Sequence, residues 1–330
     1  YKVNRLTSTD GINALLVMGS DNPKVVFACH MDTVPPSKSE HTNTTDDGDK
    51  IYGLGTKDMK GGCVAALAAL SQIKNAKNVG IIFYSDEEYN QRGIKYLCGY
   101  FAKNPIKPKL IISPESRFNL GYGARGVLVV DLIVKGVRAH SARPHLGKDA
   151  IKSLFVLVKE LETMFSETTQ LGQTSFTITQ INGGVLDSEG NITHHAGSIP
   201  DICKATISIR NAIPTLTTQL LIESIEKIAT TNGVKVQVIS KEDLPTRLVP
   251  MELVNRLQSE IEKNLHISIA LGDPKTSGYN DADLLAKSLR CQVINFGPYG
   301  EDNHTADEWV SLESIKNTAK ILICVASSID

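Results

Sequence analysis

Residues 24–36 read KVVFACHMDTVPP, in which an apolar run ends in His30-Met31-Asp32 and two prolines follow. A short apolar run that prolines stop is typical of a buried β-strand. Side chains two residues apart lie on the same side of a strand, so the imidazole of His30 and the carboxylate of Asp32 can be adjacent. Open α/β sheets bind ligands at the carboxyl ends of their strands. The stretch therefore predicts a His–Asp pair at a ligand-binding edge, although the pair by itself also fits a buried histidine held by its neighbour.

The composition is that of a globular protein that binds a small ligand. The chain has 330 residues, of which 41% are hydrophobic and 22% charged, and its net charge is −1. This length predicts about two domains, and the charge gives no reason to expect nucleic acid or an anionic membrane. We find no run of ~18 apolar residues and no secretory leader, so we expect no membrane span. The six cysteines are scattered without a C-x-x-C pair, which favours reduced core residues in a cytoplasmic protein.

Carboxylates also occur at the ends of other apolar segments. Residues 79–84 and 108–112 predict two core strands, and the run of small residues over 59–74 predicts a helix packed tightly on the sheet. Acidic residues follow both strands, and another precedes the helix. Such a repetition at successive element ends is difficult to explain by chance. The residues concerned are Asp58, Glu87, Glu88 and Glu115.

The order of the predicted elements divides the chain into two domains. Residues 12–18 and 25–30 predict two strands joined by a polar turn, which we interpret as a hairpin. A β-α-β-β-α-β pattern with a turn at Asn182-Gly183-Gly184 then interrupts the α/β pattern, and this order is that of a self-contained two-layer unit. We therefore predict a discontinuous α/β catalytic domain of residues 1–123 and 243–330, with an inserted α+β domain of residues 124–242.

A late-loop histidine, His304, adds to the carboxylates and His30 to complete a set of metal ligands. Two histidines and three carboxylates, one of them bridging, could hold two divalent cations about 3.5 to 4 Å apart. Mixed nitrogen and oxygen ligands favour two Zn²⁺ ions, with Co²⁺ or Mn²⁺ as alternatives. Adjacent residues of an extended chain point to opposite sides, so Glu87 and Glu88 suit a division between a general base and a metal ligand.

These motifs resemble the di-zinc amidohydrolase and exopeptidase family of acetylornithine deacetylase, succinyl-diaminopimelate desuccinylase and glutamate carboxypeptidase. The resemblance covers nearly the whole chain, and it implies a three-layer α/β catalytic domain. By this resemblance, His30, Asp58 and Glu115 hold one zinc, and Asp58, Glu88 and His304 hold the other. Asp32 orients His30, Glu87 is the general base and acid, and the peptide bond after Asp58 is cis. The motifs are His30-Met31-Asp32, Gly55 to Gly62, Ser85 to Glu88, Pro114-Glu115 and His304.

The resemblance also implies a lid role for the inserted domain, through which two chains form a homodimer. His140 matches a lid histidine that stabilises the oxyanion, often in the partner subunit's active site. Arg210 matches a lid arginine whose planar guanidinium grips a substrate carboxylate. Residues 276–281 are loosely similar to a substrate-contacting stretch, which makes Asn280 a candidate substrate ligand.

The function that follows is zinc-dependent hydrolysis of the amide bond of a small N-acyl amino acid. Acetylornithine and succinyl-diaminopimelate are the first two substrates to test. A di- or tripeptidase or a carboxypeptidase that uses the same two metals is the alternative, since the same ligands serve both reactions. A binding module without catalysis would lack a ligand or the base, and this sequence lacks neither.

Overall fold

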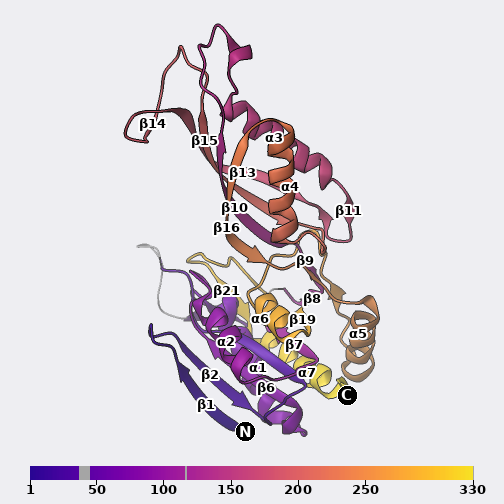
Figure 1. Cartoon of the computed structure of the whole chain (residues 1–330). Helices are drawn as coiled ribbons and strands as arrows, with labels where there is room; N and C mark the ends of the chain where they lie inside the picture. Colours follow the sequence, from indigo (N-terminus) through magenta and orange to yellow (C-terminus); the bar gives the residue numbers. More distant parts are fainter. Residues whose placement is uncertain (37–44, 116, 330) are drawn as a thin grey trace. The chain divides into compact units, whose positions relative to one another are not determined.

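The computed structural model describes residues 1–36, 45–115 and 117–329, which form two compact units (Figure 1). The discontinuous unit consists of Tyr1–Gly123 and Arg247–Asp330, and the inserted unit of Ala124–Thr246. The inserted unit extends four residues past the predicted boundary at residue 242, because its last strand, β16 (Lys235–Leu244), crosses that position.

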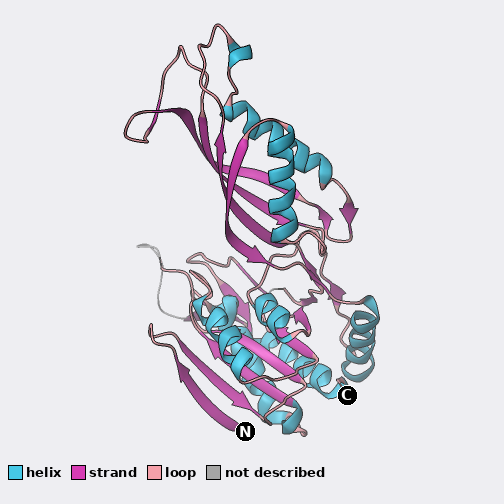
Figure 2. Cartoon of the chain, in the orientation of Figure 1, coloured by secondary structure: helices cyan, strands magenta, loops and turns pink. Residues whose placement is uncertain are grey.

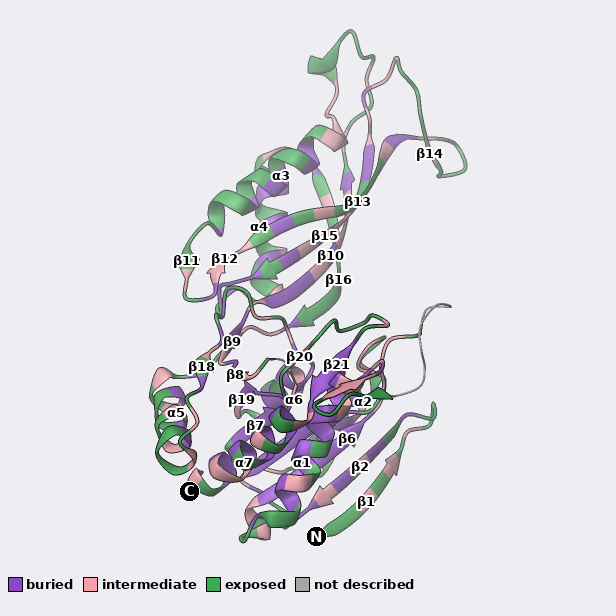
Figure 3. Cartoon of the chain, turned by 180° about the vertical axis from the view of Figure 1, so that it is seen from behind, coloured by how far each residue is buried: buried purple, intermediate pink, exposed green. Residues whose placement is uncertain are grey.

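A six-stranded sheet forms the centre of the discontinuous unit, in the order β1-β2-β6-β3-β7-β19. Strands β6, β3, β7 and β19 are parallel, whereas β1 and β2 are antiparallel to their neighbours. Every residue of β3 and β6 is buried, as expected of strands covered on both faces, while β1 is largely exposed at the edge (Figure 3). The bounds are β1 (Lys2–Thr7), β2 (Asn13–Met18), β3 (Val25–His30), β6 (Val79–Tyr84), β7 (Leu110–Ser113) and β19 (Gln292–Asn295).

Helices cover both faces of this sheet, and the predicted three-layer α/β architecture is thereby confirmed. Side chains alternate along β3, so that Phe27 packs with α1, α5 and α7 whereas Val26 packs with α2 and α6. The small residues of α1 allow close packing on the sheet, as the sequence predicts. The bounds are α1 (Gly61–Gln72), α2 (Arg92–Lys103), α5 (Met251–Leu265), α6 (Ala282–Leu289) and α7 (Leu312–Ser328).

The predicted hairpin of residues 12–18 and 25–30 is wrong. Strand β2 pairs with β1 on one side and with β6 on the other, and β3 is the next strand beyond β6. Residues 79–84 form a fully buried strand, β6, which enters the sheet between the two segments that are consecutive in sequence.

The inserted unit is a five-stranded antiparallel sheet with two helices on one face (Figure 2). Its main elements follow the predicted β-α-β-β-α-β order, and apolar side chains of the sheet and both helices share one core. The sheet order is β14-β13-β15-β10-β16. The bounds are β10 (Gly126–Lys135), α3 (Ala150–Met164), β13 (Ser175–Leu186), β14 (Ile192–Thr193), β15 (Ile202–Asn211) and α4 (Thr218–Thr231).

The turn predicted at Asn182-Gly183-Gly184 is also wrong, because β13 continues through these residues and pairs with β15. The glycines instead permit close packing. A Cβ on Gly183 would lie 2.6 Å from Ile151 Cγ1, and one on Gly184 would lie 2.3 Å from the carbonyl oxygen of Thr193.

Smaller elements complete the chain. A second sheet of the discontinuous unit has the order β20-β21-β5-β4. All six cysteines are free, and none of the described helices is long and apolar enough to cross a membrane. The bounds are β4 (Thr45–Asp46), β5 (Lys50–Tyr52), β8 (Asn119–Leu120), β9 (Gly123–Ala124), β11 (Thr168–Thr169), β12 (Gly172–Gln173), β17 (Arg247–Leu248), β18 (Ala270–Leu271), β20 (Gly300–Glu301) and β21 (Trp309–Ser311).

Candidate metal centre

The predicted metal ligands lie together at the carboxyl edge of the central sheet. His30 is the last residue of β3, and acidic residues follow β6 and β7. Asp58 belongs to the turn Thr56–Lys60 before α1, and its peptide bond to Met59 is cis, as predicted. Among the described residues, three groups of three have ligand atoms within 4.8 Å of one another, and two of these groups share Asp58. Those two groups are His30, Asp58, Glu115 and Asp58, Glu88, His304.

The two oxygens of Asp58 face different histidines. Asp58 Oδ1 lies 3.1 Å from His30 Nε2, and Oδ2 lies 3.4 Å from His304 Nε2. Each histidine also approaches a second carboxylate: His30 Nε2 is 4.0 Å from Glu115 Oε2, and His304 Nε2 is 3.3 Å from Glu88 Oε1. A carboxylate whose two oxygens serve two neighbouring ligand sets is the arrangement that a bridged pair of metal ions requires.

Asp32 lies on the opposite side of the His30 ring from Asp58. Its Oδ1 is 3.7 Å from His30 Nδ1, and its Oδ2 accepts a hydrogen bond of 3.1 Å from the backbone N–H of Glu88. The ring is completely buried. A carboxylate beside Nδ1 directs Nε2 toward the shared cluster, which is the contact that orients a metal-binding histidine.

The cluster concentrates negative charge in a poorly solvated place. Burial, with the Asp281 and Glu115 carboxylates, raises the pKa of Glu87 to about 9. Burial and Asp58 raise the pKa of Glu115 to about 8. Burial works in the same direction on Asp58, but the hydrogen bond with His30 and the charges of His30, Lys57 and His304 together outweigh it, so the Asp58 pKa is lowered. Divalent cations would offset this accumulation of carboxylates.

The donor atoms fit metal ions. Glu88 Oε1, a candidate ligand atom, is buried and has no hydrogen-bond partner among the described residues. Imidazole nitrogens and carboxylate oxygens are the ligands of Zn²⁺ and of related divalent ions. In the third group, the ligand atoms of His30, Glu87 and Glu88 lie within 4.8 Å of one another. Glu87 therefore lies at the edge of this cluster, beside the ligands.

The sequence analysis missed Glu308, which holds the loop that carries Asp58. This side chain is completely buried. Its Oε2 accepts from the backbone N–H of Gly55, and its Oε1 accepts from those of Lys57 and Asp58, each at 2.8 Å. In the sequence, Glu308 is marked only as an acidic residue four positions after His304. Nothing in the sequence connects it to residues 55–58.

Asn280, the predicted substrate ligand, contacts a metal ligand in this structure. Its side chain is buried, and its amide nitrogen donates to Glu115 and, at 3.2 Å, to Ser113 Oγ. These contacts are those of a residue that positions Glu115. Its predicted contact with substrate stays a prediction.

His140 and Arg210 belong to the inserted unit and are both exposed. His140 Nδ1 accepts a hydrogen bond of 3.1 Å from the backbone N–H of Ala142. Arg210 lies in β15, paired with Val127 of β10 and with Ser175 of β13. Their predicted roles stay predictions.

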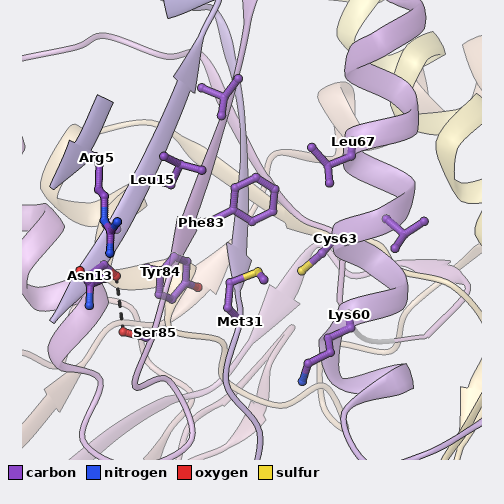
Figure 4. Close-up of a pocket in the computed structure, with 13 residues that line it drawn as sticks. Arg5, Asn13, Leu15, Met31, Lys60, Cys63, Leu67, Phe83, Tyr84 and Ser85 are labelled. Carbon is purple, nitrogen blue, oxygen red and sulfur yellow. Dashed lines mark hydrogen bonds between the residues drawn. The ribbon is translucent and has the colours of Figure 1, made fainter. Parts of the chain in front are cut away.

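Two cavities of the discontinuous unit lie near the cluster and differ in character. One, of about 720 Å³, opens between strands β2 and β6 and helix α1, with Leu15, Phe83 and Leu67 in its walls (Figure 4). None of its described lining residues is a histidine or a carboxylate. The other, of about 590 Å³, includes Glu115 in its wall together with polar residues of the loop after β19. The second cavity therefore adjoins the candidate ligands.

Comparison with known proteins identifies similar chains. Residues 26–328 match the model of the peptidase family M20/M25/M40. A succinyl-diaminopimelate desuccinylase from Erythrobacter litoralis is 29% identical over 92% of this chain and 80% of its own length. The aminopeptidase PepT from Bacillus cereus has a TM-score of 0.71 at 19% identity, covering 99% of this chain and 89% of that one. A dinuclear metal-binding M20 peptidase from Bacillus subtilis has a TM-score of 0.63 at 14% identity, covering 98% and 87%. With the family model spanning most of its length, the chain belongs to the peptidase family M20/M25/M40.

Proposed function

We propose that this metal-dependent amidohydrolase cleaves the amide bond of a small N-acyl amino acid and releases a carboxylate and a free amine. The observation that carries the proposal is the pair of ligand groups that share Asp58, with Glu87 beside them. The desuccinylase relative supports an acyl amino acid as the substrate. Two metal ions per chain, most suitably zinc, fit the mixed imidazole and carboxylate donors.

When bound, two divalent cations supply Lewis acidity to the acyl carbonyl and to the attacking water. Glu87 takes a proton from that water and later delivers it to the nitrogen of the leaving amine. Asp32 keeps the His30 ring oriented throughout, because it lies beside Nδ1 and away from the reacting atoms.

The inserted unit supplies the remaining groups of the proposal. His140 donates a hydrogen bond to the oxyanion that forms at the acyl carbon, and Arg210 binds a substrate carboxylate through its guanidinium. Both side chains are exposed on this unit. We further propose that this unit acts as a lid and that two chains form a homodimer through it. We also propose that the enzyme is cytoplasmic, because free thiols such as its six cysteines persist in a reducing compartment.

Hydrolysis of short peptides is the second candidate. The aminopeptidase from Bacillus cereus and a tripeptidase from Staphylococcus aureus share this fold. A peptide bond and an N-acyl bond are both amides, so the same ligands and base would serve for either. The two substrate classes differ only in the groups beyond the scissile bond.

A substrate panel distinguishes the two candidates. The purified chain, reconstituted with Zn²⁺ and in parallel with Co²⁺, would be assayed by amine release from acetylornithine, succinyl-diaminopimelate and a set of di- and tripeptides. We expect the highest kcat/KM on an N-acyl amino acid. A kcat/KM on peptides that exceeds every N-acyl value would replace the deacylase proposal with the peptidase one.

A further inference from the structure

The segment between β6 and α2 brings two adjacent glutamates to one cluster. Neighbouring side chains of an extended chain point to opposite sides, yet ligand atoms of Glu87, Glu88 and His30 lie within 4.8 Å of one another. The chain therefore leaves the extended conformation directly after β6. It does so at Asp86, whose φ of 70° is left-handed, and residues 87–90 form a turn. The placement of the proposed base and of a metal ligand depends on this turn.

The carboxylate of Asp86 joins the turn to the start of α2. Few residues other than glycine adopt a left-handed conformation readily, and aspartate is among them because its short side chain forms local hydrogen bonds. Asp86 Oδ2 accepts a hydrogen bond of 2.9 Å from Arg92 Nε, and its Oδ1 accepts one of 2.9 Å from Arg92 Nη2. Oδ2 also accepts one of 3.1 Å from the backbone N–H of Arg92, the first residue of α2. The side chain and the backbone of one arginine thus hold the left-handed residue.

The turn is held at two places. Before Glu87, α2 approaches closely, because a Cβ on Gly93, its second residue, would lie 2.0 Å from the carbonyl oxygen of Ser85. After Glu87, the backbone N–H of Glu88 donates a hydrogen bond of 3.1 Å to Asp32 Oδ2. The contact with Asp32 belongs to the centre itself, whereas the contact with α2 comes from outside it.

Arg92 lies where a substitution can be made without opening the core. Its side chain is 49% exposed, whereas that of Asp86 is 11% exposed. Arg92 Nη1 also lies 3.9 Å from Asp10 Oδ2, a longer contact between two exposed groups. An ion pair of this exposure adds little to the stability of the fold, because water screens it. Two parallel hydrogen bonds nevertheless fix the orientation of a carboxylate, so the pair acts mainly on the geometry of the turn.

We propose that Arg92 is a positioning residue, which fixes Asp86 and thereby directs Glu87 and Glu88 to the metal centre. The inference rests on the proposed function where it concerns Glu87 as the base. Its consequence for metal binding through Glu88 does not depend on which amide is cleaved. A misplacement of about 1 Å at a reacting group can lower the rate by about 10²-fold, so a loosened turn affects catalysis even when the fold is intact.

Arg92→Gln removes the charge and the paired donors. We expect its affinity for Zn²⁺ and Co²⁺ to fall about tenfold, because Glu88 is less firmly placed. The visible absorption of bound Co²⁺ changes, since it reports the geometry of the ligands. With full metal occupancy, kcat on the best substrate of the panel falls about tenfold and KM changes by less than about twofold, because Glu87 acts on substrate that is already bound. The Tm of the metal-free variant stays within about 2 °C of the wild type.

Three further variants separate the contact from its charge. Arg92→Lys keeps the charge without the paired donors, so its losses are intermediate. Asp86→Asn tolerates the left-handed conformation but removes the ion pair, so it resembles Arg92→Gln. The double variant of these two loses no more than either single variant, because both remove the same contact. Lys103→Gln, the matched control, removes one positive charge from the exposed far end of α2 and leaves metal affinity and kcat unchanged.

Each other outcome is decisive. Wild-type metal affinity in Arg92→Gln, or wild-type kcat at full metal occupancy, overturns the proposal. A Tm that falls by more than about 5 °C shows that the pair stabilises the fold instead of the turn, and it overturns the proposal as well. Additive losses in the double variant overturn the route through Asp86. A wild-type enzyme that hydrolyses no amide of the panel overturns the proposed function, and the metal titrations and Co²⁺ spectra then still decide the role of Arg92.

Discussion

Glu308→Gln tests whether one buried carboxylate holds the loop that carries Asp58. The wild-type carboxylate accepts three backbone hydrogen bonds at 2.8 Å, from Gly55, Lys57 and Asp58. A glutamine at this position has one oxygen and one NH₂ group. Whichever way the amide points, its NH₂ faces at least one backbone N–H, so at least one bond is lost and two donors are opposed.

The magnitude follows from these bonds. One charge-assisted hydrogen bond contributes roughly 2 kcal/mol, and the two that remain weaken by about 1 kcal/mol each when the acceptor becomes neutral. The side chain is 0% exposed, so water cannot replace them. We therefore expect the free energy of unfolding to fall by about 4 kcal/mol, which corresponds to a Tm lower by about 8 to 16 °C.

Thermal unfolding of the metal-free protein, followed by circular dichroism, measures this change, and titration with Zn²⁺ measures its consequence at the centre. We expect zinc affinity to fall about 10- to 100-fold, because Asp58 is then less firmly placed. Asp307→Asn is the matched control, since Asp307 is adjacent and exposed. A Glu308→Gln variant that melts within about 2 °C of the wild type and binds zinc as tightly would refute the reasoning.

Three further predictions concern the metal centre. Glu87→Gln should retain the zinc content of the wild type but lower kcat by about 10²- to 10⁴-fold. A variant that metal analysis shows to be zinc-loaded and that turns over at nearly the wild-type rate would exclude Glu87 as the base. Asp32→Ala should weaken zinc binding about 10- to 100-fold without abolishing folding, and an unchanged zinc titration would contradict its orienting role. The pKa of Glu115 and that of Glu87 rise in the folded state, from 4.5 to about 8 and about 9, so the metal-free protein loses stability as pH rises from about 4.5 to about 9. Zinc should therefore raise Tm more at pH 9 than at pH 6. An equal rise at both pH values would contradict the raised pKa values of Glu87 and Glu115.

The hydrophobic pattern of each segment predicted the α/β fold well, because whether a strand or helix is buried depends mainly on its own side chains. The fully apolar run of residues 79–84 became a central strand, and the small residues of α1 pack on the sheet as expected. Strand order did not follow from such patterns. The hairpin of residues 12–18 and 25–30 failed because adjacency in sequence does not prevent another buried strand, here β6, from entering between two segments.

Glycine-rich stretches misled for a related reason. Gly183 and Gly184 have a turn-like sequence, yet they pair with β15 as part of a strand, and Ile151 and Thr193 approach them too closely for a Cβ. The sequence shows that a residue is glycine. Only the packing shows whether glycine is needed for a turn or for the close approach of a neighbouring residue.

The sequence by itself determined the candidate metal ligands of this protein. These ligands are imidazole and carboxylate side chains near the ends of predicted elements, and the fold brings their ligand atoms close together. They are His30, Asp58, Glu88, Glu115 and His304. The tertiary structure alone decided which residues support them. Glu308 binds the loop before Asp58, and Asn280 binds Glu115, across more than 160 residues in each case. A metal ligand is identified by its own side chain, whereas a supporting residue is identified only by its partner, and partners distant in sequence meet only when the chain folds.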